Sequence, residues 1–314
     1  MKIVFWGKGD RGEACLRALV NKFEVLKIIL EPNLEDRNNN LIKIAQNYNI
    51  DIFSPENPNS SNTAKLLKSF GADIFILAGY GKIIKQNIID IPNKLSVNLH
   101  GGKLPNYRGS SPMNWAIING EKDYSVSIIK VDQGVDTGDI LIEKNIPILP
   151  EDTIYSLHNK ANEAFSEILI ELLTNLKMMI KNRKKQSSDE ASYYSIRKPE
   201  DGFISWEYLT AKDIHNRIRA LTIPYPCAFS FYNRKKIILI KSKLKKSTFI
   251  GEPGRIYKIS KNNGLLVAAN DKCLWIQEAV YAETGESIMH TVKRYDRFCR
   301  IQDLFTELYS KNNI

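Results

Sequence analysis

An amide and an imidazole stand two positions apart in the first third of the chain. Asn98 and His100 lie in SVNLH, an apolar run that ends at Gly101-Gly102. Because residues i and i+2 of a strand share one face, the two side chains converge on one point. A histidine of near-neutral pKa can take a proton from an amine, and an amide can donate to the oxyanion of a tetrahedral intermediate. The pair therefore predicts acyl transfer to an amine.

A carboxylate beside the histidine would favour its protonated form and fix its orientation. The stretch VDQGVDTGD offers three, which are Asp132, Asp136 and Asp139. Their spacing does not choose among them.

A second motif, the glycine-rich GKGDRG at residues 7–12, stands between an apolar run and a helical pattern, and Glu31 ends the next apolar run. This is the layout of a dinucleotide site, in which glycines let a pyrophosphate approach a helix N-terminus. A non-catalytic NAD-binding module is therefore an alternative function. Lys8 and Arg11 crowd the loop with charge, and the spacing arises readily in other strand-to-helix turns, so we favour acyl transfer.

Apolar runs alternate with amphipathic helical patterns through residues 1–181, which predicts an α/β domain of the Rossmann type. Its sheet should be mostly parallel, with helices on both faces and the site at the carboxyl edge of the strands. Residues 182–202 are polar and lack apolar periodicity, so we expect a linker. Short strand patterns broken by Gly, Asn and Lys over residues 203–314 predict a smaller β-rich domain, an OB-like barrel.

Bulk properties narrow the class of protein. The formal charge of +10 comes from basic residues that are spread out, which disfavours a nucleic-acid groove. No apolar run reaches the ~18 residues of a membrane span. The four cysteines lie far apart with no CxxC pair, which indicates a reduced, cytoplasmic protein and no metal site.

Taken together, the motifs resemble the folate-dependent formyltransferase family, whose members carry Asn-x-His, Leu-Pro-x-x-Arg-Gly and Asp-Thr-Gly-Asp. Here these stand at residues 98–100, 104–109 and 136–139. The distal stretch at residues 197–229 resembles the second domain of methionyl-tRNA formyltransferase and of bacterial amino-sugar formyltransferases. The resemblance covers most of the chain.

The resemblance implies that Asn98 stabilises the oxyanion, that His100 is the general acid/base and that Asp136 orients it. The formyl donor would be N10-formyltetrahydrofolate, with no metal. The residues expected around the folate are Lys82, Ile83, Ile84, Gly102, Lys103, Leu104, Pro105, Ser110, Asp132, Gln133, Gly134 and Val135.

Two acceptor amines fit this chemistry. Family members that act on methionyl-tRNA carry a glycine- and basic-rich insertion after the second strand, which EPNLEDRNNNLIKIAQ lacks, and YRGSSPMNWAIINGE is closer to the sugar-modifying members. We therefore expect a UDP- or dTDP-linked amino sugar, as used in polysaccharide biosynthesis, with methionyl-tRNA as the alternative and tRNA then the partner. Lys8, Arg11 and Arg197 are candidates for the diphosphate, and Trp206 for stacking on the substrate. The second domain could support a homodimer.

Overall fold

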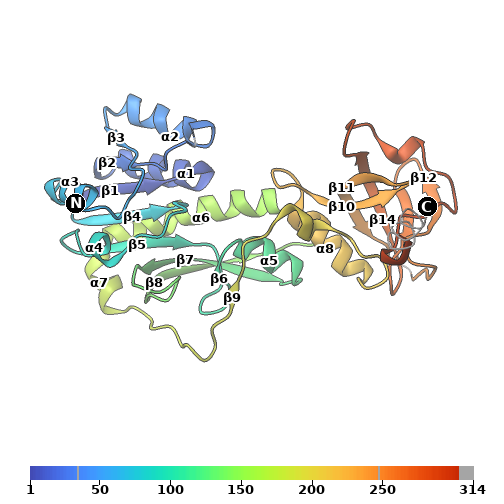
Figure 1. The fold of residues 1–314 in the computed structure, drawn as a ribbon. Coiled ribbons are helices and arrows are strands. Elements are labelled where there is room, and N and C mark those ends of the chain that lie inside the picture. The colour runs from blue at the N-terminus through green and yellow to red at the C-terminus, as the bar shows by residue number, and fades with distance from the viewer. Residues whose placement is uncertain (34, 247, 304–314) are drawn as a thin grey trace, which may run out of the picture. The chain divides into compact units, whose positions relative to one another are not determined.

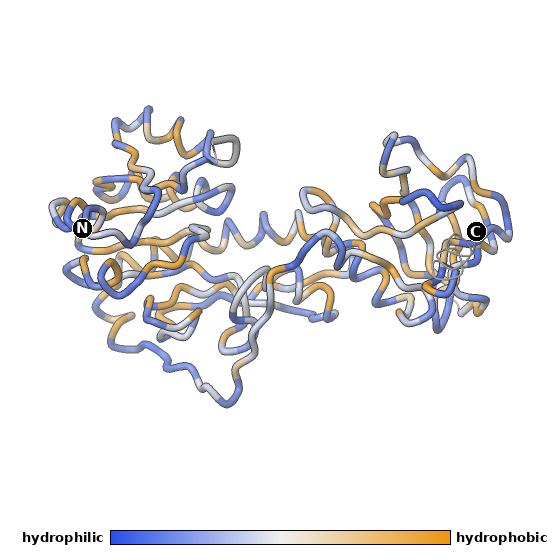
Figure 2. Tube along the Cα trace, in the orientation of Figure 1, coloured by the Kyte–Doolittle hydropathy of each residue, from blue (hydrophilic) through white to orange (hydrophobic). Residues whose placement is uncertain are grey.

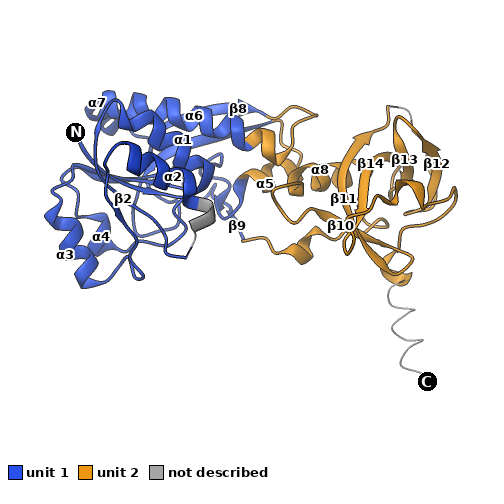
Figure 3. Ribbon diagram, turned by 90° about the horizontal axis from the view of Figure 1, so that it is seen from above, with its two compact units in different colours: residues 1–112, 123–147, 158–195 blue, residues 113–122, 148–157, 196–314 orange. Residues whose placement is uncertain are grey.

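The computed structural model describes residues 1–33, 35–246 and 248–303, so the last part of the predicted second domain, residues 304–314, lies outside it. The chain forms two compact units (Figure 3). Unit 1 contains residues 1–112, 123–147 and 158–195, and unit 2 contains residues 113–122, 148–157 and the chain from 196 onward. Unit 2 therefore includes two short segments from the N-terminal part of the chain, a division that differs from the contiguous domains expected from the sequence.

Unit 1 is built on a seven-stranded sheet with the order β3-β2-β1-β4-β5-β7-β8 (Figure 1). Its strands are β1 (Lys2–Gly7), β2 (Glu24–Ile29), β3 (Ile52–Phe53), β4 (Ile74–Ala78), β5 (Leu95–His100), β7 (Asp123–Lys130) and β8 (Ile140–Pro147). The first five are parallel, and β7 and β8 are antiparallel to their neighbours. The predicted mostly parallel α/β sheet is confirmed.

Helices cover both faces of this sheet. They are α1 (Gly9–Val20), α2 (Glu35–Asn47), α3 (Ser61–Ser69), α4 (Gln86–Ile89), α6 (Ile154–Thr174, from residue 158 onward in unit 1) and α7 (Leu176–Lys181). Leu67 of α3 and Ile88 of α4 join the buried cluster on the face that carries Trp6 and Leu77. On the other face, Arg11 of α1 lies over the ring of Phe165 of α6, with 4.7 Å between guanidinium carbon and ring centroid.

The antiparallel direction of β7 decides how its following loop reaches β5. In the sheet, Val97 of β5 is paired with Lys130 at the end of β7, and the backbone N–H of Val131 donates to the carbonyl of Ser96 at 2.8 Å. The loop at residues 131–139 therefore starts beside the middle of β5 and must fold back along it to reach His100. A simple parallel sheet would have placed this loop at the strand ends.

Unit 2 contains an antiparallel sheet with the order β10-β11-β14-β13-β12, which confirms the predicted β-rich domain. Its elements are α5 (Pro112–Ile118, from Met113 onward), η1 (Pro199–Gly202), α8 (Ala211–Leu221), β10 (Ala228–Tyr232), β11 (Lys235–Leu244), β12 (Ile256–Ser260), β13 (Gly264–Ala268), β14 (Cys273–Tyr281) and η2 (Ile288–His290). A capping box starts α8, since Thr210 accepts from the N–H of Asp213 and the carboxylate of Asp213 accepts from the N–H of Thr210.

The two edge strands of this sheet are linked by one segment near the end of the described chain. The N–H of Ile256 in β12 donates to the carbonyl of Asp296 at 2.8 Å, and the N–H of Cys299 donates to the carbonyl of Phe231 in β10 at 2.8 Å. The segment therefore connects the two edges of the sheet, as expected for the barrel that the sequence predicted.

The polar stretch predicted as a linker is bonded to unit 1 over much of its length. Figure 2 shows its first part as mostly hydrophilic. Lys184 and Ile140 exchange backbone hydrogen bonds of 2.8 and 2.9 Å, and β9 (Tyr193–Tyr194) pairs in parallel with β6 (Arg108–Gly109). The polar composition of this stretch therefore reflects its hydrogen bonds to loops of unit 1, and not an unattached linker.

Within the part of the chain that the structure describes, no helix is both long and apolar enough to cross a membrane.

Candidate active site

The side chains of Asn98 and His100 meet one carboxylate, that of Asp136. Nδ2 of Asn98 donates to Oδ1 of Asp136 at 3.2 Å, and Nδ1 of His100 lies 3.4 Å from Oδ2. The backbone N–H of Gly109 donates to the same Oδ2 at 3.0 Å. The structure therefore brings together the three residues that the sequence predicted to be catalytic.

The other two carboxylates of the loop serve different partners. Oδ1 of Asp132 accepts from the N–H of Gly134 at 3.2 Å and from the hydroxyl of Thr137 at 2.5 Å, which closes a local turn. Asp139 pairs with Arg183 at 2.7 Å. Of the three candidates, Asp136 is the one found beside the histidine.

The hydrogen bond on the far side of the His100 ring identifies its tautomer. Nε2 lies 2.8 Å from the carbonyl oxygen of Tyr107. A carbonyl only accepts, so Nε2 carries the hydrogen, and in the neutral ring the lone pair is on Nδ1. Nδ1, which faces Asp136, is therefore the atom that takes up or releases a proton.

The surroundings of His100 favour its neutral form. The residue is 5% exposed, and this burial lowers its pKa below the ordinary 6.5. The carboxylate of Asp136 and the Tyr107 carbonyl oppose the shift, whereas the guanidinium groups of Arg11 and Arg108 add to it. At neutral pH the ring can then act as a base.

Close packing fixes the backbone around the ring. A Cβ atom on Gly102 would lie 2.6 Å from Nε2 of His100 and 2.7 Å from the Tyr107 carbonyl, so only glycine fits. Tyr107 adopts a φ of 59°, and its ring stacks on Tyr194 with centroids 4.7 Å apart and 4° between the planes. In this conformation the Tyr107 carbonyl reaches Nε2 of His100.

Sequence reasoning missed the residues that support these loops from the segment after α7. Arg108 is 3% exposed, and its guanidinium donates to Oε1 of Gln186 and, at 3.0 Å, to the hydroxyl of Tyr193. The backbone of Arg108 donates to the carbonyl of Ser192 at 3.0 Å. The adjacent tyrosines 193 and 194, large aromatic residues in a polar stretch, were the signal that this stretch packs against something.

The residues predicted around the folate lie on three segments of unit 1, at 82–84, 102–110 and 132–135. Val131 and Ile84 pack in the same apolar cluster, which brings the first and third segments together. Ile83 exposes 75% and Val135 49% of its surface, so the first and third segments each present an apolar side chain to solvent. Exposed apolar side chains on adjacent loops suit a flat heterocycle such as that of folate. The folate contacts of these residues stay a prediction, and this arrangement is compatible with it.

Several side chains of these segments already have protein partners. Ile84 and Leu104 are buried in apolar clusters, so only their backbone could meet a ligand. Lys82 donates to the carbonyl of Glu56 at 2.7 Å, and Lys103 pairs with Asp123 at 2.9 Å. The hydroxyl of Ser110 lies 3.4 Å from that of Ser111.

The two cations of the glycine-rich loop also have partners within unit 1. Lys8 pairs with Glu31 at 2.8 Å, and the same carboxylate oxygen accepts from the N–H of Gly81 at 2.6 Å. Arg11 donates to the carbonyl of Leu99 at 3.0 Å. Their role at a diphosphate stays a prediction. The acidic residue of the supposed dinucleotide fingerprint is engaged by protein groups.

Glycine at position 12 has a packing explanation. A Cβ atom there would lie 3.3 Å from the carbonyl oxygen of Ala78 and from the backbone of Gly7, so α1 can approach β1 and β4 because this residue has no side chain. The spacing of the motif therefore needs no NAD to account for it.

The two substrate candidates of unit 2 differ in outcome. Arg197 lies over the ring of Trp115 at 4.8 Å and donates to the carbonyl of Asp201 at 2.8 Å, and its role at a substrate stays a prediction. The prediction for Trp206 is wrong, because this side chain is 0% exposed, donates to Ser230 at 2.9 Å and packs on Phe298. A core position leaves no ring face for a substrate.

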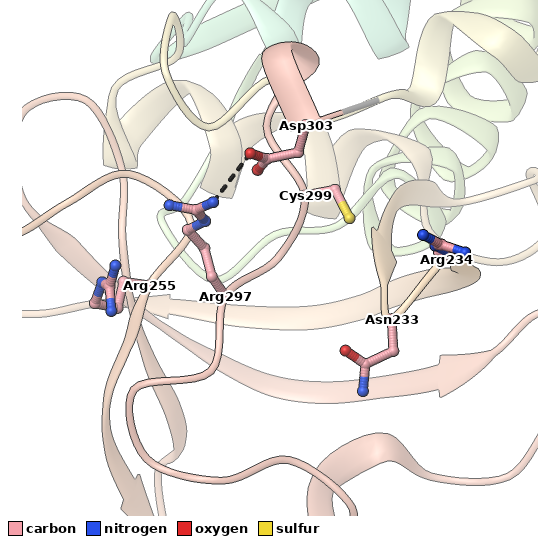
Figure 4. Close-up of a pocket in the computed structure, with 6 residues that line it drawn as sticks. All are labelled: Asn233, Arg234, Arg255, Arg297, Cys299 and Asp303. Atoms are coloured by element: carbon pink, nitrogen blue, oxygen red, sulfur yellow. Dashed lines mark hydrogen bonds and ion pairs between the residues drawn. The ribbon is translucent and has the colours of Figure 1, made fainter. Parts of the chain in front are cut away.

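Unit 2 also contains a hollow of about 480 Å³, shown in Figure 4. Its lining residues are Asn233, Arg234, Arg255, Arg297, Cys299 and Asp303. Arg297 donates to Asp303 at 3.0 Å, and Arg300 reaches the same oxygen at 3.3 Å. This hollow is lined without an imidazole, so the constellation around His100 is the better candidate for proton transfer.

Comparison with known proteins agrees with this geometry. The model of the formyl transferase family matches residues 25–173, and that of the formyl transferase C-terminal domain matches residues 197–290. Methionyl-tRNA formyltransferase of Thermodesulfovibrio yellowstonii is 34% identical over 93% of this chain and 94% of its own. The bifunctional polymyxin resistance protein ArnA of Wigglesworthia glossinidia brevipalpis is 36% identical over 90% of this chain and 43% of its own.

Solved structures share the fold. An N-formyltransferase from Helicobacter canadensis, in complex with folinic acid and dTDP-3-aminofucose, aligns with a TM-score of 0.66 at 23% identity over 88% of this chain and 99% of its own. HypX from Aquifex aeolicus aligns with a TM-score of 0.64 at 17% identity, and this chain spans about half of its length, 48%. With two matching family models and a relative at 34% identity over nearly the whole length, the chain belongs to the formyl transferase family of enzymes.

Proposed function

We propose that this enzyme transfers a formyl group from N10-formyltetrahydrofolate to the primary amine of a nucleotide-linked amino sugar. The observation that carries formyl transfer is the convergence of Asn98 and His100 on the carboxylate of Asp136. The exposed apolar side chains of Ile83 and Val135 fit a flat folate ring. When bound, that donor supplies an electrophilic formyl carbon.

The protein side of the reaction follows from the geometry. Nδ1 of His100 accepts a proton from the attacking amine, and Asp136 stabilises the imidazolium that results. The imidazolium then returns the proton to the donor nitrogen as its bond to the formyl carbon breaks, so the products are the N-formyl sugar and tetrahydrofolate. The amide nitrogen of Asn98 has two hydrogens; one bonds to Asp136, and the second can serve the oxygen that gains negative charge. Burial of His100 keeps water away from this proton transfer.

The connection between β2 and α2 supports a sugar nucleotide as acceptor. It consists of residues 30–34, Leu-Glu-Pro-Asn-Leu, and holds a carboxylate but no Lys or Arg. Glu31 is held there by Lys8 and Gly81. A basic insertion, which would attract the phosphates of an acceptor stem, does not stand at this position. The Helicobacter canadensis relative binds a dTDP-linked amino sugar.

Methionyl-tRNA is the second candidate acceptor. It is favoured by the 34% identity to a methionyl-tRNA formyltransferase over 93% of this chain. The two acceptors are distinguished by offering UDP- and dTDP-linked amino sugars and charged initiator tRNA in parallel, and by reading the gain of a formyl group by mass spectrometry. Formylation of the tRNA with no reaction on any sugar nucleotide would reject our proposal.

The role of His100 is tested separately. His100→Ala should lose about 10³-fold in turnover while folate binding persists, because general acid–base catalysis contributes of this order. The matched control is His290→Ala, which changes an exposed histidine of unit 2. Near-normal turnover of His100→Ala would exclude His100 as the base.

A further inference from the structure

Gln186 stands between the two loops that contact His100. Its Oε1 accepts from Nε and Nη2 of Arg108 at 3.0 and 2.8 Å. Its Nε2 donates to the carbonyls of Asp136 and Gly138 at 2.9 and 2.6 Å. The amide therefore makes four hydrogen bonds, which is its full complement, and only one orientation of the amide satisfies them.

The two loops tied by Gln186 lie on opposite sides of the His100 ring. Arg108 follows Tyr107, whose carbonyl accepts from Nε2, and precedes Gly109, whose N–H holds the Asp136 carboxylate. Asp136 lies on the Nδ1 side. One side chain thus connects the supports of both ring nitrogens.

Asp136 depends on such support. It is a non-glycine residue with a φ of 55°, a conformation that costs energy and persists only where the surroundings hold it. Gln186 donates to the carbonyl of this residue and to that of Gly138 two positions later. The Gln186 amide therefore holds the strained turn through the backbone carbonyls of Asp136 and Gly138. The carboxylate of Asp136 stays available to Asn98, Gly109 and His100.

The segment that carries Gln186 is itself anchored on both sides. Before it, Lys184 is bonded to Ile140 in both directions. After it, Ser110 donates to the carbonyl of Tyr194 at 2.9 Å, and Tyr107 donates to the hydroxyl of Ser192 at 3.2 Å. Gln186 is therefore part of a fixed strap across the catalytic loops rather than a residue of a free linker.

We propose that Gln186 is a positioning residue for formyl transfer, which sets the placement of Asp136 against His100 without touching the substrate. This rests on the proposed role of His100 and Asp136 in that reaction. Two substitutions distinguish the bonds made by the amide oxygen of Gln186 from those made by its nitrogen. Gln186→Ala removes all four bonds. Gln186→Glu keeps an acceptor for Arg108 but turns an oxygen toward two carbonyls, so it loses the bonds to Asp136 and Gly138.

The decisive measurement is a titration of the His100 ring by NMR on protein labelled with 15N in histidine, because it needs no substrate. The four histidines can be assigned by single substitutions. The charged groups acting on this ring are Asp136, Arg11 and Arg108. A displaced Asp136 no longer opposes the effect of burial, so the pKa of His100 should fall further in Gln186→Ala. In Gln186→Glu the added carboxylate acts in the opposite direction, so Gln186→Ala is the variant that the titration tests. Exposed Ser187→Ala, next in the chain, should leave the pKa of His100 unchanged.

Turnover gives the second readout. Both variants should lose between about 10-fold and 100-fold in kcat, as expected for a misplaced catalytic group. Their melting temperatures should also fall, because the buried guanidinium of Arg108 or the carbonyls of Asp136 and Gly138 lose their partner. An unchanged His100 titration in Gln186→Ala overturns the proposal, whatever happens to stability. If the titration shifts but no acceptor is formylated by the parent enzyme, the positioning role stands and the proposed function fails.

Discussion

Oδ2 of Asp136 lies 3.4 Å from Nδ1 of His100, the ring nitrogen that is left to exchange a proton once Nε2 has bonded to the Tyr107 carbonyl. The carboxylate and the burial act on the ring in opposite directions. Burial is the larger effect, so the pKa of His100 lies below 6.5 and the carboxylate keeps it from falling further. A base of this kind is active when neutral, so turnover should rise with pH through the His100 pKa and then level off.

Asp136→Asn should move this rise to lower pH. The substitution removes the charge that raises the pKa of His100 and leaves the burial that lowers it. The plateau of kcat should drop by about 10²-fold, because the imidazolium formed during proton transfer is no longer stabilised. The measurement is kcat against pH. Asp139→Asn removes the same charge from the same loop at a carboxylate that pairs with Arg183, and serves as control; a shift of the Asp136→Asn profile to higher pH would contradict the assignment.

The part of this site that could be predicted from sequence is the part encoded locally. Alternation along a strand placed Asn98 beside His100 from their spacing alone. Asp136 required the family motif, because its approach depends on a loop that folds back along β5 from an antiparallel neighbour. Gln186 was invisible, since a polar residue in a polar stretch gives no periodic signal and its partners are 78 and 50 residues away in sequence.

The fold shows the same limit. Hydrophobic periodicity identified the strands of the parallel sheet and the β-rich second half. That residues 113–122 and 148–157 belong to unit 2 depends on long-range packing, such as the bonds from Arg219 to the carbonyls of Leu149 and Asp152 at 3.2 and 2.9 Å. Trp206 was assigned to a substrate because it followed a polar stretch, yet its burial comes from contacts with Ser230 and Phe298 that the local sequence does not reveal.

Trp206→Phe should therefore affect stability and leave acceptor affinity unchanged. The buried hydroxyl of Ser230 would lose the indole donor, and the smaller ring would leave a void beside Phe298. We expect the free energy of unfolding of unit 2 to fall by about 2 to 3 kcal/mol. Denaturant unfolding and the acceptor KM would be measured in parallel. Trp275→Phe, at a half-buried position, should cost less; a large rise in KM for Trp206→Phe would restore a role at the substrate.

His158 of α6 should make the fold sensitive to acid. Burial, with a smaller effect from Arg11, lowers its pKa from 6.5 to about 4. As pH falls from 6.5 toward 4, the unfolded chain takes up a proton at this residue before the folded chain does, so the folded state loses stability over this range. The full shift corresponds to at most about 3 kcal/mol. His100 and His215, whose pKa values burial also lowers, act in the same direction.

The contribution of His158 can be isolated with a variant that replaces this histidine alone, because the other three histidines then contribute equally in parent and variant. The free energy of unfolding would be measured at about pH 7 and pH 5 for the parent, for His158→Gln and for His290→Gln, the last at an exposed position. The loss of stability between the two pH values should be smaller by about 2 kcal/mol in His158→Gln, since about 1.5 pH units of the shift lie in this interval. The exposed control should keep the loss of the parent. Equal losses in all three proteins would mean that His158 is protonated alike in the folded and unfolded chain.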